Sequence, residues 1–266
     1  MTGPGRNTEN RPIDTPVPAA DSNPIPEPGI GRAGFAPTQW SVVLAARSDS
    51  VRRREALETL CGTYWLPIYS YLRRRGNPPA DAEDLTQGFF TQLLTGDFLD
   101  QPDPARGRFR GFLMSALRQF LASQTERQSA QKRGGGMQFL DWTTAEAERE
   151  LANHGLIQQD PGEAYETSWA LAVMAKALRR LEEEQLAAGK TRQFVVLKPY
   201  LSATPTRGDY EAAAQELGTS RTNVAVWVHR LGQRYAELVK LEIAATVDDP
   251  TEVKAELQHL VAVLRR

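Results

Sequence analysis

Residues Tyr210 to Leu231, which read YEAAAQELGTSRTNVAVWVHRL, have the pattern of two helices joined by a short turn. The first half has small apolar residues at helical spacing. Asp209 is expected to cap this helix, and Gly218 allows the chain to turn sharply after it. Ser220 supplies an N-cap for a second helix. The apolar residues of the second helix share one face: Val224, Val228, Leu231, Tyr235 and Leu238.

The opposite face of this second helix is mostly polar. It carries Thr222, Val226, His229 and Gln233, flanked by Arg221, Asn223 and Arg230. Short polar side chains near a helix N-terminus reach base edges, and arginine and histidine reach bases or phosphates. The segment is therefore interpreted as a helix-turn-helix whose second helix enters the major groove of DNA. An ordinary helical hairpin within a bundle is the alternative.

Helical periodicity continues on both sides of this motif, and no series of strand-like alternations occurs. We therefore predict an all-α fold. The clearest apolar stripe predicts a long helix from Phe109 to about Leu121. Phe109 and Phe112 at its start are either core residues or exposed rings that would hold a base. Further helices are predicted near residues 50–75, 80–94, 161–188, 191–197 and 249–264.

Composition divides the chain into five parts. Residues 1–37 hold eight of the 17 prolines and few large apolar residues, so a disordered tail is expected there. A polyproline docking motif is the alternative for this tail. Two small helical domains are predicted at 38–133 and 161–246, joined by an acidic linker at 134–160. A C-terminal helical extension at 247–266 could pack on the second domain, cover it or bind a regulator.

The charge is segregated along the chain. The formal net charge of -1 argues at first against a protein that coats nucleic acid, because such a protein is basic overall. However, residues 106–133 hold seven basic and one acidic side chains, and residues 141–184 hold ten acidic and four basic ones. These net charges of +6 and −6 cancel, so the near-neutral sum says little about partners. The acidic segment could shield the basic one until a partner separates them.

Several classes of protein are disfavoured by the residues present. The single cysteine, Cys61, excludes an internal disulfide framework and multi-cysteine zinc sites. No apolar run approaches the roughly 18 residues of a membrane helix, and the N-terminal residues lack the apolar core of a secretory signal. We therefore expect a cytoplasmic protein with no membrane partner.

Asp81, Glu83 and Asp84 open one predicted helix, where acidic side chains complement the helix dipole. Neighbouring carboxylates could also serve acid–base catalysis or bind a metal. The three histidines, at positions 154, 229 and 259, fit no ligand or triad spacing. We expect neither an enzyme, a cofactor nor a metal site.

Taken together, the two halves resemble bacterial RNA polymerase sigma factors of the extracytoplasmic-function type. The stretch Asp81–Gln87 with the following apolar residues Phe89, Phe90 and Leu93 looks like the region-two helix that docks on the polymerase clamp. Residues 109–119 look like the next helix, which melts and reads the −10 promoter element. Residues 210–235 look like region four, which reads the −35 element and touches the polymerase flap. The resemblance covers about residues 38–133 and 161–243.

The resemblance implies roles for individual residues. Contacts to the polymerase clamp fall on Asp81, Glu83, Asp84 and Gln87. Contacts to −10 DNA fall on Arg110, Arg118, Gln119, Ser123, Gln124 and Arg127. Contacts to −35 DNA fall on Ser220, Arg221, Thr222, Asn223, Val226, His229 and Arg230. The chain departs from the family at residues 225–227, which lack basic side chains, at residues 126–129, which lack the usual arginines, and in its C-terminal extension.

The expected function is that of a sigma factor, which binds core RNA polymerase and directs promoter recognition and transcription initiation. Core RNA polymerase and promoter DNA are the expected partners, and an anti-sigma factor or other regulator is a further candidate. A stand-alone helix-turn-helix regulator is the first alternative. A helical interaction protein with no DNA role is the second.

Overall fold

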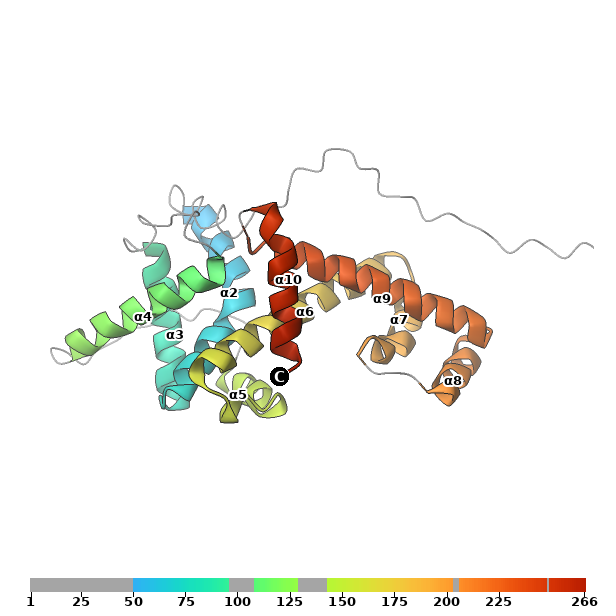
Figure 1. The fold of residues 1–266 in the computed structure, drawn as a ribbon, viewed down its shortest axis with the longest axis horizontal. Coiled ribbons are helices and arrows are strands. Elements are labelled where there is room, and N and C mark those ends of the chain that lie inside the picture. The colour runs from blue at the N-terminus through green and yellow to red at the C-terminus, as the bar shows by residue number, and fades with distance from the viewer. Residues whose placement is uncertain (1–49, 96–107, 129–142, 203–205, 248) are drawn as a thin grey trace, which may run out of the picture. The chain divides into compact units, whose positions relative to one another are not determined.

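The computed structural model describes residues 50–95, 108–128, 143–202, 206–247 and 249–266. Within these ranges the secondary structure is helical and no strand is present, so the prediction of an all-α fold is confirmed (Figure 1). The proline-rich stretch at residues 1–37, for which a disordered tail was predicted, lies outside the described residues.

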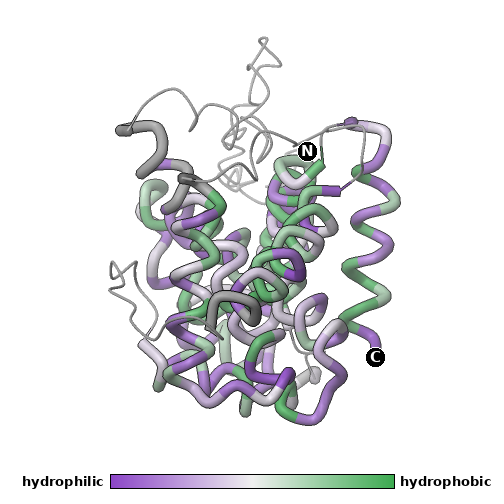
Figure 2. The backbone as a smooth tube through the Cα atoms, turned by 90° about the vertical axis from the view of Figure 1, so that its left-hand side faces the viewer, coloured by the Kyte–Doolittle hydropathy of each residue, from purple (hydrophilic) through white to green (hydrophobic). Residues whose placement is uncertain are grey.

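The helices follow the predicted order along the chain. The first half forms α2 (Ser50–Arg74), α3 (Pro79–Thr95) and α4 (Phe109–Gln128). The second half forms α6 (Pro161–Ala187), α7 (Thr191–Leu197), the short 3-10 helix η4 (Lys198–Leu201), α8 (Arg207–Leu217) and α9 (Arg221–Ala244). Hydrophilic and hydrophobic stretches are intermixed along the helical part of the tube in Figure 2. Apolar residues that recur at helical spacing let a helix bury one face.

Part of the predicted linker is a helix of its own. Residues 143–158 form α5 (Thr144–Asn153) and the 3-10 helix η3 (Leu156–Gln158). A capping box begins α5: the Thr143 backbone N–H donates to Glu146 Oε2 at 2.9 Å, and the Glu146 N–H donates to the Thr143 hydroxyl at 3.3 Å. Ala147 and Leu151, four residues apart, bury the apolar side of α5 against α2 and α3. The part of this acidic segment that the structure describes is therefore mostly helical.

Helix α6 contacts both halves of the chain. Near its start, the Ser168 hydroxyl donates to the Ser70 hydroxyl of α2 at 2.8 Å. Further along, the Tyr235 hydroxyl of α9 donates to the Met174 carbonyl oxygen at 3.1 Å. We assigned α6 to the second domain from the sequence, yet its most extensive packing is against α2.

The start of α6 has the predicted cap. Asp160 is the N-cap, and its carboxylate accepts hydrogen bonds from the Gly162 and Glu163 backbone N–H groups, while Pro161 occupies the first turn. An equivalent signal begins the C-terminal extension. The Asp249 carboxylate accepts from the Thr251 N–H at 2.8 Å, and the 3-10 helix η5 (Pro250–Glu252) leads into α10 (Val253–Leu264). Helix α10 packs against α6 and α9.

Large aromatic residues fill the core between α2, α3, α4 and α6. The most completely buried side chains include Trp65, Trp169, Tyr64, Tyr69, Tyr165, Phe89, Phe90, Phe109 and Phe120. The core interpretation of Phe109 is therefore confirmed, and Phe112 is half-buried against the same core. Among the described helices, none combines the length and apolarity needed to cross a membrane.

Candidate nucleic-acid interface

Helices α8 and α9 meet in the turn that the sequence predicts. Gly218 has φ 64° and ψ 38°, a left-handed conformation that glycine adopts without steric cost. Ser220 follows in an extended conformation, and its hydroxyl accepts a hydrogen bond from the Asn223 N–H at 3.2 Å. The predicted turn and second cap are both present.

The first cap of the motif differs from the prediction. The N-cap of α8 is Thr206, and Asp209 occupies the third helical position, where its carboxylate accepts from the Thr206 N–H at 2.7 Å. The hydrogen bonds from the Thr206 hydroxyl and backbone lower the pKa of Asp209. The helix begins earlier than predicted because a threonine followed three residues later by an acid forms a capping box.

The apolar sides of α8 and α9 pack together as expected from their spacing. Ala213 and Ala214 of α8 are buried, as are Val224 and Leu231 of α9. This packing fixes which side of α9 faces solvent.

The solvent side of α9 carries the residues that the resemblance assigns to −35 DNA. All seven of them are exposed: Ser220, Arg221, Thr222, Asn223, Val226, His229 and Arg230. Three make contacts within the motif. Ser220 caps the helix, the Arg221 guanidinium lies 3.2 Å from the Glu211 carboxylate, and the Asn223 amide donates to the Thr219 hydroxyl at 3.0 Å.

The other four form an exposed stripe, hereafter the α9 stripe: Thr222, Val226, His229 and Arg230. Among the described residues, none forms a hydrogen bond or ion pair with these four side chains. Their spacing of three and four residues places them on one side of the helix. The stripe thus presents a hydroxyl, an apolar group, an imidazole and a guanidinium on a fixed backbone.

The residues assigned to −10 DNA do not share one environment. Arg118 and Gln119 of α4 are exposed, whereas Ser123 and Gln124 are half-buried and the Ser123 hydroxyl donates to the Phe120 carbonyl oxygen. The side chain of the remaining C-terminal candidate, Arg127, lies outside the described residues. On this helix the exposed candidates are therefore Arg118 and Gln119.

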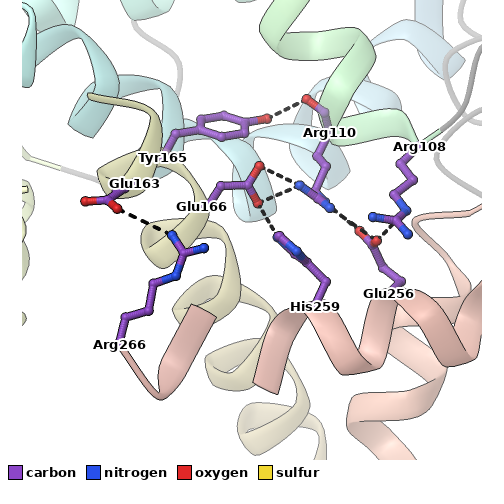
Figure 3. A network of polar contacts seen from close by, with 8 residues as sticks. All are labelled: Arg108, Arg110, Glu163, Tyr165, Glu166, Glu256, His259 and Arg266. Carbon is purple, nitrogen blue, oxygen red and sulfur yellow. Dashed lines mark hydrogen bonds and ion pairs between the residues drawn. The ribbon is translucent and has the colours of Figure 1, made fainter. Parts of the chain in front are cut away.

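Arg110, by contrast, is buried in a cluster of charges rather than exposed on α4 (Figure 3). Its Nε donates to Glu256 Oε1 of α10 at 2.6 Å, and its Nη1 donates to Glu166 Oε1 of α6 at 2.5 Å. Arg108 Nε lies 2.8 Å from Glu256 Oε2, and His259 Nε2 lies 2.9 Å from Glu166 Oε2. We refer to these five residues as the Arg110 cluster.

Further contacts hold Arg110 in place. Its guanidinium lies over the Trp169 ring, 5.0 Å from the centroid, and its carbonyl oxygen accepts from the Tyr165 hydroxyl at 3.0 Å. Burial lowers the pKa of Arg110, but the hydrogen bonds that its guanidinium donates to Glu256 and the negative charges of Glu166 and Glu256 outweigh this, so the pKa is raised above its ordinary value. Arg110 is therefore a charged residue that joins α4 to α6 and α10.

Sequence reasoning missed this cluster, although one signal pointed to it. Glu256 occupies the apolar side of α10, four residues before Leu260 and seven before Val263, and all three are buried. An acid at a core position of a helix requires a buried basic partner. The partner itself, Arg110, lies 146 residues away and could not be identified from spacing.

The residues assigned to the polymerase clamp lie on α3. Asp81 and Asp84 are exposed, and Glu83 and Gln87 are half-buried. The Glu83 carboxylate accepts from the Thr144 hydroxyl at the start of α5 and from the Gln87 amide. Two of the four are thus held by neighbours, and two are accessible to a partner.

No group of three or more side chains able to hold a metal ion occurs among the described residues. Comparison with protein-family models, with curated proteins and with solved structures gave no match to this chain. A functional assignment accordingly depends on the residues themselves and on their geometry.

Proposed function

We propose that this protein is a sigma factor, which binds core RNA polymerase and directs it to promoters through the α8–α9 helix-turn-helix. The observation that carries the proposal is the α9 stripe, which lies exposed on a helix fixed by the left-handed Gly218 turn and the Ser220 cap. In a DNA-binding helix-turn-helix, the residues near the start of the second helix contact base edges.

The chemistry of the α9 stripe suits the major groove. From Thr222 to Arg230 the stripe extends about 12 Å along the helix axis at 1.5 Å per residue. The groove admits a helix, and hydroxyl, imidazole and guanidinium groups all bond base edges or phosphates. The positive end of the α9 dipole, next to the exposed Arg221 guanidinium, adds attraction for a phosphate.

A polymerase partner is supported by how few exposed cations the candidate DNA-contacting residues supply within the described part of the chain. These cations are Arg221 and Arg230 on α9 and Arg118 on α4. Since each neutralised phosphate contributes to affinity, so few contacts give weak binding at physiological salt. Tethering both DNA-facing helices to one polymerase would raise their effective concentration at a promoter. The exposed acids Asp81 and Asp84 of α3 offer a surface for that docking.

The test is a pull-down of core RNA polymerase by the full chain, followed by run-off transcription on genomic fragments. We expect the chain to associate and to direct transcripts from discrete start sites. The Arg230→Ala variant should lose these transcripts, whereas Lys254→Ala, an exposed cation on α10, should keep them. Transcripts unchanged by Arg221→Ala and Arg230→Ala together would favour the helical interaction protein without a DNA role.

One observation favours the stand-alone regulator as the second candidate. Arg110, which the resemblance assigns to −10 DNA, is buried between Glu166 and Glu256, while the α9 stripe is exposed. A regulator that uses only its helix-turn-helix needs no second DNA-facing helix. Specific DNA binding by the chain alone, with no association with core polymerase, would establish this candidate and reject the first.

A further inference from the structure

Val226 is an apolar residue in the middle of the polar α9 stripe. Val226 is 41% exposed to solvent, whereas Val224 and Val239 of the same helix are buried. One turn before it lies Thr222, and one turn after it lie His229 and Arg230, all exposed. A single exposed valine is ordinary on a protein surface. Its position among potential base-contacting groups is what calls for an explanation.

The fold leaves this side chain available for a partner. The packing of α8 against α9 uses Val224 and Leu231, which are buried on the other side of the helix. A valine stabilises a protein mainly because burial removes its methyl groups from water. Val226 is partly exposed, so it contributes only part of that free energy in the protein alone. A complex in which a partner covers Val226 with an apolar group would therefore be stabilised.

The major groove offers one such apolar group at base edges. The C5-methyl of thymine projects into the groove, while the other bases present hydrogen-bond donors and acceptors there. Val226 lies in the second turn of α9, which begins at Arg221, within the part of a recognition helix that contacts bases. We propose that Val226 is a specificity-determining residue that reads the C5-methyl of a thymine in the target DNA. This inference rests on the DNA-binding function proposed above.

The neighbours of Val226 are positioned for such a contact. The ion pair of Arg221 with Glu211 at 3.2 Å and the hydrogen bond from Asn223 to Thr219 at 3.0 Å hold the start of α9. A helix that is already formed presents its side chains at a smaller ordering cost at binding. Arg230, one turn beyond Val226, would contact a guanine or phosphate beside the thymine, and Thr222 would contact the base step on the other side.

The experiment begins with selection of duplexes from a random pool by the full chain bound to core polymerase, and in parallel by the chain alone. Each thymine of the selected site is then replaced, one at a time, by deoxyuridine, which lacks only the methyl group. We expect one thymine at which this replacement weakens binding about fourfold, the factor for losing one buried methyl group. This first arm needs no protein variant.

A second arm assigns the effect to the side chain. The Val226→Ser variant should bind duplexes with thymine and with deoxyuridine at that position equally. The Val226→Thr variant keeps one methyl group on a branched side chain and should retain part of the difference in affinity. Leu241→Ser is the matched control, because Leu241 is 47% exposed on the same helix but about 22 Å further along. It should leave the full difference in place.

The outcomes separate this inference from the proposed function. If neither preparation selects a duplex, the DNA-binding proposal fails and the inference fails with it. If a site is selected but no thymine in it responds to deoxyuridine, the role of Val226 is overturned while DNA binding stands. A response that persists unchanged in Val226→Ser assigns methyl recognition to another residue and also overturns the inference.

Discussion

Replacing Glu256 with glutamine is the sharpest test of the Arg110 cluster. Glu256 is fully buried, with a side-chain exposure of 0%, and its carboxylate contacts Arg110 at 2.6 Å and Arg108 at 2.8 Å. Glutamine has nearly the same shape but carries no charge. The variant therefore leaves a buried guanidinium of Arg110 with Glu166 as its remaining carboxylate.

The size of the effect follows from burial. Breaking a buried ion pair by removing one partner costs about 3–5 kcal/mol, because the other charge stays buried without compensation. Glu166 still contacts Arg110 at 2.5 Å, and Glu166 is partly exposed, so we expect the lower end, about 3 kcal/mol of unfolding free energy. For a chain of this size the melting temperature should fall by roughly 6–12 °C.

The measurement is urea unfolding followed by circular dichroism, with a thermal scan beside it. Glu237→Gln is the matched control, because Glu237 is exposed and its pair with Arg234, at 2.8 Å, lies on the surface. Loss of this surface ion pair should change the free energy of unfolding by less than about 1 kcal/mol. An unchanged slope of the unfolding free energy against urea concentration would show that the variant unfolds from the same compact state.

A loss in Glu256→Gln no larger than that in Glu237→Gln would refute the reasoning. It would mean that the carboxylate of Glu256 contributes no more in the core than an exposed one does at the surface. The contact between α4 and α10 would then have to be explained by apolar packing alone.

Three further predictions concern local features. Gly218→Ala should destabilise the chain by about 1–2 kcal/mol in urea, because φ is 64° and a side chain is strained there, although no atom lies within 4 Å of the added carbon. Ser220→Ala should cost about 1 kcal/mol in the same assay through loss of the cap. The hydrogen bond from Arg73 lowers the pKa of the Glu148 carboxyl group. The stability that this pair contributes is therefore complete above the ordinary pKa of a glutamate, and it is lost as the pH falls through the lowered pKa of Glu148. Glu148→Gln should therefore reduce the acid dependence of the melting temperature between about pH 5 and 3; an unchanged acid dependence would contradict the assignment.

Local signals in the sequence were sufficient for the start of several helices. Asp160 and Asp249 both begin helical segments as predicted, since a carboxylate that accepts from the next N–H groups needs only residues within three positions. The left-handed Gly218 and the Ser220 cap follow from the same kind of short-range information. The capping box of Thr143 and Glu146 was also readable, but the acidic composition around it favoured a linker instead.

The exposed side of α9 was also predictable. Once Val224, Leu231 and Leu238 are assigned to the core, the helical period places Thr222, Val226 and the residues one turn later on the opposite side. What the sequence did not give was their partners. The pairing of Arg221 with Glu211 and of Asn223 with Thr219 depends on how α8 lies across the turn.

Caps, turns and apolar periodicity act over a few residues, so the sequence alone predicts the all-α class, the two helices joined at Gly218 and the helix that starts after Asp249. The burial of Arg110 with Glu166 and Glu256, and the packing of α6 on both α2 and α9, are visible only in the folded chain. These outcomes depend on residues as far as 146 positions apart. Whether a basic side chain meets solvent, DNA or a buried carboxylate is set by the packing of whole helices, which no local pattern of charge can specify.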